Sequence, residues 1–165
     1  MDEFPDEDFG GKRISEQCKV IEVSPALRDD ISSPKYQKLL DPKKDFLEME
    51  HDYLAFEISG KNGEPWIKID LLDSKNLMGV VVVNRVGFHG SKQRLRLRQV
   101  PLCLWVSDDN VKWKRVGRDM DAKLEYRFDM RKLNCRGRYL RVGREPDINY
   151  KPFHLSRVII YSRKR

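Results

Sequence analysis

Arg85 combines a residue type and a position that suit ligand binding. It follows an apolar run at residues 80–83 and precedes a glycine-bearing loop that contains Phe88 and His89. A guanidinium placed there can form paired hydrogen bonds with vicinal hydroxyls, a carboxylate or a phosphate. The alternative is that Arg85 donates to loop carbonyls and only stabilises its own end of the fold. His89 either binds a ligand or is exposed without a role, and Phe88 either projects towards a ligand or packs on the end of the fold.

A second group of arginines follows in the same region. Arg94, Arg96 and Arg98 alternate with Leu95 and Leu97, so in a strand the three guanidinium groups lie on one face. Because like charges repel, this face needs an anionic counterpart. A ligand is one candidate, and acidic residues on the neighbouring strand are the other.

The three tryptophans are expected in different environments. Trp66 shares one face of an alternating segment with Lys68 and Asp70, which favours partial exposure, and an exposed indole can stack on a sugar ring or a base. The alternative is that Trp66 closes one end of the fold. Trp105 lies in an apolar segment and is expected in the core, and Trp113 is expected to pack beneath the turn that precedes it.

Common catalytic motifs are absent from the sequence. It contains no Gly-x-Ser-x-Gly, no His-Glu-x-x-His and no phosphate-binding loop. Its three cysteines, Cys18, Cys103 and Cys135, lack the spacing of a metal site. We therefore expect buried free thiols and no enzymatic activity.

Charge is distributed unevenly along the 165 residues, whose formal net charge is +7. Residues 85–165 contain 22 Lys or Arg and 8 Asp or Glu, whereas residues 1–84 contain 11 and 18. Two interpretations stay open: halves that pack together with solvated outer charges, or a basic face for an anionic partner such as nucleic acid or an acidic polysaccharide. No apolar run approaches the roughly 18 residues of a membrane span, and no apolar secretory segment begins the chain. The expected location is therefore the cytoplasm, unless the chain is a fragment of a larger protein.

Alternating segments separated by turn signals predict an all-β fold. We expect a flexible acidic arm at residues 1–13, one domain at residues 14–162 and a basic tail at residues 163–165. Ser33 and Pro34 predict the start of one short helix near the N-terminus. Strands are expected at residues 18–23, 52–58, 66–71, 77–83, 94–106, from 113 onward, 126–130, 138–143 and 155–161, with 73–76 as a turn. This regular spacing is typical of an antiparallel β-sandwich or jelly roll.

Five short segments, in this order, make the sequence resemble the discoidin family, also called the coagulation factor V/VIII type C domain. They are residues 65–71 (Pro-Trp-Ile-Lys-Ile-Asp-Leu), 83–85 (Val-Asn-Arg), 106–110 with Trp113, 137–142 and 155–161. The resemblance covers about residues 53–161. It implies a galactose-binding-like jelly roll of two packed antiparallel sheets, a ligand site in loops at one end, and no catalysis by the domain itself.

The resemblance also implies particular site residues. Sugar-binding members use one histidine and two arginines, and Arg85 and Arg98 match the two arginines by position. Near the place of the histidine this sequence has Glu57, which departs from the pattern. Asp41 and Asp45 lie in the region of the family's calcium loop, but the Asp-Gly turn of that loop is missing. No cofactor is therefore assigned, and calcium stays a candidate.

Three functions stay open at this point. The first is a non-catalytic carbohydrate-binding module with these candidate ligand contacts: Arg85, Arg98, Glu57, Trp66, His89 and Phe88. The second is an intracellular scaffold or nucleic-acid-binding domain that uses the basic half of the chain. The third is an accessory domain of a glycan-processing enzyme. Phosphate binding depends steeply on salt, whereas hydrogen bonding to neutral hydroxyls does not, so a salt titration separates the first two.

Overall fold

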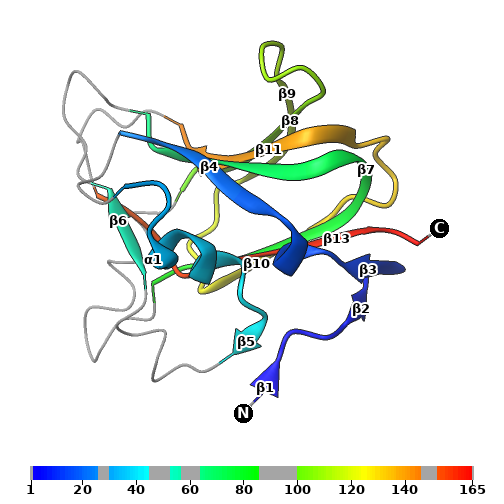
Figure 1. Ribbon diagram of the computed structural model, residues 1–165, viewed down its shortest axis with the longest axis horizontal. Coiled ribbons are helices and arrows are strands. Elements are labelled where there is room, and N and C mark those ends of the chain that lie inside the picture. Colours follow the sequence, from blue (N-terminus) through cyan, green and yellow to red (C-terminus); the bar gives the residue numbers. More distant parts are fainter. Residues whose placement is uncertain are drawn as a thin grey trace.

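Two antiparallel β-sheets packed face to face form the protein (Figure 1). The computed structural model describes residues 2–25, 30–44, 53–56, 64–85, 100–145 and 152–164. The long strand β7 (Trp66–Val83) belongs to both sheets. This architecture is the antiparallel β-sandwich that the sequence predicts.

The two sheets share β7 and otherwise use different strands. Across the first sheet the order is β4 (Lys19–Ser24), β7, β11 (Arg136–Arg144), β8 (Leu102–Ser107) and β9 (Lys114–Asp119). In the second sheet β7 lies between β10 (Glu125–Asp129) and β13 (Arg157–Arg163), and β13 is followed by β3 (Gly11–Arg13) and β2 (Glu7–Asp8). Two short pairs complete the described strands: β1 (Asp2–Glu3) with β5 (Lys43–Lys44), and β6 (Leu54–Phe56) with β12 (Phe153–Leu155).

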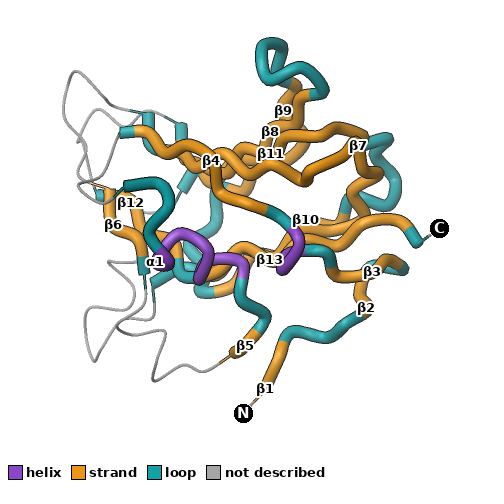
Figure 2. The backbone as a smooth tube through the Cα atoms, in the orientation of Figure 1, coloured by secondary structure: helices purple, strands orange, loops and turns teal. Residues whose placement is uncertain are grey.

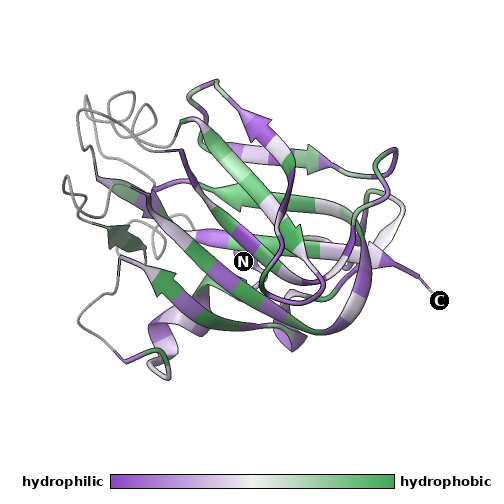
Figure 3. Cartoon of the chain, turned by 90° about the horizontal axis from the view of Figure 1, so that it is seen from above, coloured by the Kyte–Doolittle hydropathy of each residue, from purple (hydrophilic) through white to green (hydrophobic). Residues whose placement is uncertain are grey.

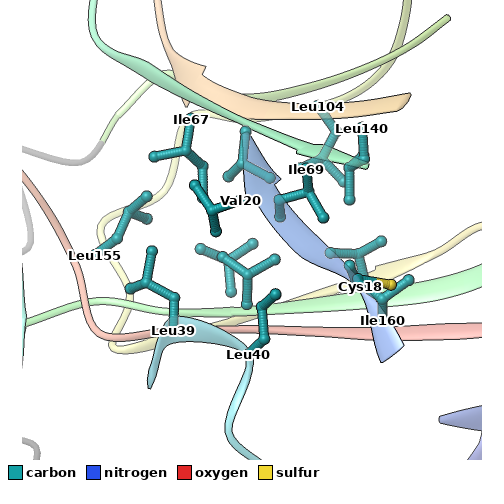
Figure 4. Close-up of a cluster of buried hydrophobic side chains, with 14 of the residues drawn as sticks. Cys18, Val20, Leu39, Leu40, Ile67, Ile69, Leu104, Leu140, Leu155 and Ile160 are labelled. Atoms are coloured by element: carbon teal, nitrogen blue, oxygen red, sulfur yellow. The ribbon is translucent and has the colours of Figure 1, made fainter. Parts of the chain in front are cut away.

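The core lies between the sheets, where alternate residues of facing strands point inward (Figure 4). Ile67 and Ile69 of β7 contribute from the first sheet, and Ile160 of β13 contributes from the second. Leu39 and Leu40 pack against this cluster from the short helical segment. Hydrophobic and hydrophilic residues alternate along the strands (Figure 3), which is the period expected when a sheet is covered on one face.

β7 is one bent strand, where the sequence predicted two strands joined by a turn at residues 73–76. Leu72 has a φ of 69°, yet main-chain pairing continues beyond it. Asn76 still pairs with Arg136 in the first sheet, and from Leu77 onward β7 pairs with the second sheet. The polar segment that resembles a turn is therefore the corner at which one strand passes between the two sheets.

The apolar run at the end of β7 is covered on both faces, as its unbroken hydrophobicity predicts. Val80 and Val82 belong to the core between the sheets. Val81 and Val83 belong to a second cluster, on the outer face of the second sheet. Their buried partners there are Phe4, Phe9, Ile159 and Tyr161.

The N-terminal segment covers this outer face. Phe4 and Phe9 are only 3% and 8% exposed, and β2 and β3 extend the second sheet. The Tyr161 hydroxyl donates a hydrogen bond to the main-chain oxygen of Pro5 (2.8 Å). The expectation of a flexible arm is therefore wrong for residues 2–13. The prediction failed because it relied on the acidic composition of the segment and overlooked two phenylalanines, whose burial stabilises the ordered segment.

Helices contribute little to the described structure (Figure 2). α1 (Pro34–Gln37) continues into the 3-10 helix η2 (Lys38–Leu40), and a second 3-10 helix, η1 (Ser15–Gln17), lies between β3 and β4. The short helix predicted after Ser33 is confirmed, although the Ser33 side chain makes no capping hydrogen bond. None of the described helices has the length and apolar composition needed to cross a membrane. The predicted basic tail overlaps the last strand, because β13 continues to Arg163.

The contact between Gly79 and Phe9 can be tested by a double-mutant cycle. A Cβ atom at position 79 would lie 2.1 Å from the Phe9 ring, so Gly79→Ala should displace the ring and cost about 1–3 kcal/mol in the free energy of unfolding. In a Phe9→Ala background the ring is absent, and the same glycine substitution should cost much less. Urea unfolding of the four proteins measures the cycle, with Val111→Ala at an exposed position as the control. Strictly additive effects would contradict this packing.

Burial of Tyr161 predicts a loss of stability at alkaline pH. Burial raises the pKa of the Tyr161 phenol to about 12, whereas an unfolded tyrosine has a pKa of about 10. The stabilisation is therefore fully present below about pH 10 and is lost as the pH rises towards the folded value. We expect Tyr161→Phe to flatten the fall in unfolding free energy over this interval, measured by urea titration at several pH values. An unchanged slope in the variant would show that another group causes the fall.

Candidate ligand-binding site

Arg85 lies directly beyond β7, at the end of the sandwich where β7 both starts and finishes, which we call the Arg85 end (left in Figure 1). Its guanidinium carbon lies over the Tyr53 ring, 4.2 Å from the ring centre, which is a cation–π contact. The residue is half-buried, and its Nε has no hydrogen-bond partner among the described residues. The Tyr53 ring therefore restrains the guanidinium by a contact that uses none of its N–H donors.

Asn84 holds the main chain of Arg85 in place. Its side chain is completely buried, and its Oδ1 accepts a hydrogen bond from the Arg85 main-chain nitrogen (2.7 Å). Its Nδ2 donates to the main-chain oxygen of Lys123 (3.1 Å), and its main-chain nitrogen donates to the main-chain oxygen of Leu124 (2.8 Å). Arg85 thus projects from a fixed point beside the segment that leads into β10.

Tyr53 also contacts the ring of His154. The two rings meet edge to face, with their centres 5.7 Å apart, and His154 is only 3% exposed. His154 lies opposite Ala55 in the short ladder of β12 and β6, so the pair is anchored in strands. Sequence reasoning missed Tyr53, and the only signal was its position just before a short alternating segment.

Two further arginines at the same end are fully buried, and sequence reasoning missed both. Arg144 donates from Nη1 to the main-chain oxygen of Pro152 (3.2 Å), and its main-chain nitrogen donates to the main-chain oxygen of Pro65 (3.0 Å). Arg157 donates from Nη1 to the main-chain oxygen of Ser156 (2.8 Å). These guanidinium groups satisfy carbonyls where strands begin or end, which is a structural role. An arginine flanking an apolar strand was the available signal.

Trp66 lies on the outer face of the first sheet, in a cluster centred on Arg141. The Arg141 guanidinium carbon is 5.4, 4.8 and 4.7 Å from the rings of Trp66, Trp105 and Trp113 respectively. Lys68 adds a second cation, 5.4 Å from the Trp66 ring. Burial lowers the pKa of Arg141. The Trp66 ring is thus in contact with the protein's own cations, and no contact with Arg85 is found among the described residues.

This cluster corrects the prediction for Trp105. The sequence placed Trp105 in the core because its neighbours are apolar, but the side chain is half-buried on the outer face. Leu104 and Val106, on either side, belong to the core instead. The alternation of inward apolar and outward polar residues cannot be recognised in a strand where an outward position holds a tryptophan that an arginine covers.

Four of the predicted ligand contacts, namely Glu57, Phe88, His89 and Arg98, lie outside the described residues. Proximity of Arg98 to Arg85 therefore stays a prediction. Of the calcium candidates, Asp45 also lies outside the described residues, and Asp41 accepts a hydrogen bond from the main-chain nitrogen of Lys43 (3.0 Å). Within the described ranges no three His, Cys, Asp or Glu side chains come together as a metal site would require.

The comparisons with protein-family models and with curated proteins find no match. Solved structures do match. The family 32 carbohydrate-binding module of Streptococcus pneumoniae EndoD has a TM-score of 0.65 and 12% identity, over 93% of this chain and 100% of that module. The family 32 module of C. perfringens NanJ, in complex with galactose, has a TM-score of 0.62 and 6% identity, over 90% and 97%. A fucolectin from the serum of striped bass, Morone saxatilis, has a TM-score of 0.62 and 16% identity, over 93% of this chain and 47% of that one.

These likenesses establish the fold. At such low identity they show the fold alone, the antiparallel β-sandwich that the sequence led us to expect, and that expectation is confirmed. Membership of the discoidin family itself stays a prediction.

The three thiols should react slowly in the folded protein. Burial raises the pKa of Cys18 to about 12 and that of Cys103 to about 11, and it also raises that of Cys135. Because the thiolate is the nucleophile, we expect labelling by a disulfide reagent near pH 8 to be at least ~100-fold slower in the native protein than in urea. A thiol that reacts in the native protein as fast as free cysteine would contradict this account.

Proposed function

We propose that the chain is a non-catalytic carbohydrate-binding module that binds a glycan at the Arg85 end. One observation carries the proposal: a half-buried guanidinium lies over the Tyr53 ring, with its central carbon 4.2 Å from the ring centre, and the side chain makes no hydrogen bond or ion pair within the described part of the chain. The matching structures reported above include carbohydrate-binding modules and a fucolectin of the same fold. Their shared architecture supports a ligand site but assigns no sugar to this chain.

The chemistry of Arg85 suits a sugar. A guanidinium presents several N–H donors in a planar fork, and two adjacent hydroxyls of a sugar ring can accept from neighbouring donors. Because contact with the Tyr53 ring already restrains the guanidinium, less conformational entropy is lost when the ligand binds. A neutral hydroxyl is also less costly to desolvate than a charged group.

The remaining predicted contacts complete the proposal. Arg98 is assigned as a second donor and Glu57 as an acceptor for sugar hydroxyls, with Phe88 and His89 beside them. Trp66 is assigned a lesser part, because Arg141 and Lys68 already contact its ring. No bond is made or broken in this function, so the protein would act by holding a glycan in place.

Substitution of Arg85 tests the proposal. Hydrogen bonds to a charged group are worth about 1.5–3 kcal/mol when a partner is removed, so we expect Arg85→Ala to weaken glycan binding by about 10- to 100-fold. Arg85→Lys should recover little, because an ammonium cannot reproduce the fork. Calorimetry with galactose, fucose and N-acetylgalactosamine, alone and in oligosaccharides, measures the effect.

A matched control and a salt series make the outcome decisive. Arg138→Ala removes another arginine, whose guanidinium is exposed and pairs with Asp70 (3.0 Å), and it should leave binding unchanged. Binding through neutral hydroxyls should vary little with salt. If the wild type binds no glycan, if Arg85→Ala binds as well as wild type, or if affinity falls steeply with salt as for nucleic acid, the proposal is wrong.

A further inference from the structure

A polar groove lies at the end of the sandwich opposite Arg85, where β7 bends between the sheets (right in Figure 1, beside the C-terminus). Its volume is about 650 Å³. Five cationic side chains line it: Lys12, Lys75, Arg136, Arg163 and Lys164. The one carboxylate in its lining is Asp73. This composition gives the polar groove a strong positive potential.

The cations are held by paired strands from both sheets. Lys12 lies opposite Ser162 in the ladder of β3 and β13, and Arg136 lies opposite Asn76 in the ladder of β11 and β7. Lys75, at the bend of β7, lies opposite Gly137 in the same ladder of β11 and β7. The spacing of the positive charges is therefore fixed by the fold, and it does not depend on loops.

Most of this charge is not neutralised by the described residues. Lys12, Lys75, Arg136 and Arg163 form no ion pair with any of them. Lys164 pairs with Glu7 (2.8 Å) at an exposed position, where such a pair contributes little. Because four like charges face one hollow, an anion bound there would relieve their repulsion.

A second, smaller hollow of about 260 Å³ continues the polar groove, since Asn76 and Arg163 line both. It adds Arg131 and Lys132 as further cations. Arg131 pairs with Asp129 (2.6 Å), whereas Lys132 forms no ion pair with the described residues. Cationic side chains thus line two adjoining hollows, and this arrangement suits a chain that carries repeated negative charges better than a single small ion.

We infer that the polar groove binds a linear polysaccharide that bears sulfate or carboxylate groups. The side chains that line the two hollows include no Trp, Tyr or Phe, so neither hollow offers the stacking surface that single-stranded nucleic acids use. Their neutral polar side chains, from Gln17, Ser74, Asn76, Asn134 and Ser162, can hydrogen-bond to sugar hydroxyls. The polar groove is distinct from the site of the proposed function. It lies at the bend of β7, whereas Arg85 follows the last residue of β7 at the opposite end of the sandwich.

Charge substitution in the polar groove tests this inference. A fluorescently labelled, size-defined heparin oligosaccharide is the probe, and anisotropy measures its binding to the full chain at salt concentrations between roughly 50 and 300 mM. The double variant Arg136→Gln/Arg163→Gln removes two exposed cations. We expect it to weaken binding at least ~10-fold at the lowest salt and to reduce the slope of log affinity against log salt by about 1–2. Lys12→Gln, on a different strand, should weaken binding in the same direction.

Three controls decide the outcome. Lys43→Gln/Lys112→Gln removes the same charge at exposed positions outside the polar groove and should change affinity less than ~2-fold. Arg85→Ala should leave heparin binding intact, and the polar-groove variants should leave neutral glycan binding intact, so this inference and the proposed function can fail separately. The inference is overturned if wild type binds no heparin or if both double variants lose equal affinity. It is also overturned if Arg85→Ala abolishes heparin binding, or if duplex DNA of equal charge binds more tightly than heparin.

Discussion

The pairing of β7 with strands of both sheets is the constraint on which the rest of the structure depends. One strand enters at the Arg85 end, turns at Leu72–Asn76 and returns, so it pairs with β4 and β11 before the bend and with β10 and β13 after it. Its returning half is apolar on both faces, which requires a cover outside the second sheet as well as a core inside. The N-terminal segment provides that cover through Phe4 and Phe9. Loss of this cover would expose Val81 and Val83 to water, so the fold needs its first residues.

Among the described residues, the outer faces of both sheets are covered by other parts of the chain. The N-terminal segment packs on the outer face of the second sheet, and the cluster of three tryptophans around Arg141 occupies the outer face of the first. At the Arg85 end the arginines divide by environment. Arg144 and Arg157 are buried and donate to carbonyls, which is how a permanently charged group can be accommodated inside a protein. Arg85 has the same charge, but among the described residues its side chain contacts the Tyr53 ring and makes no hydrogen bond from Nε, which is why we propose it as a ligand contact.

Sequence patterns predicted the fold well because alternation and turn residues report burial directly. The sequence alone predicts the strand at residues 66–71, the buried run at residues 80–83 and the short helix, and the structure contains all three. The errors arose where a side chain's environment depends on distant residues. The polar corner of β7 resembles a turn because the sequence does not reveal which strands pair with it. Trp105 points outward and contacts Arg141, which lies 36 positions later in the chain. Likewise, nothing near Arg85 in sequence indicates that Tyr53 lies beneath it.

The central claim is that a glycan binds at the Arg85 end and is held by the guanidinium that stacks on Tyr53. Two-dimensional NMR of the isotopically labelled chain, titrated with galactose or fucose, tests this most directly, because it reports the location of binding as well as its occurrence. The account predicts shifts of the Arg85 Nε–H signal and of main-chain amides in β6 and β12, while those of residues 73–76 stay in place. Saturable shifts confined to the bend of β7, with Arg85 unaffected, would contradict it.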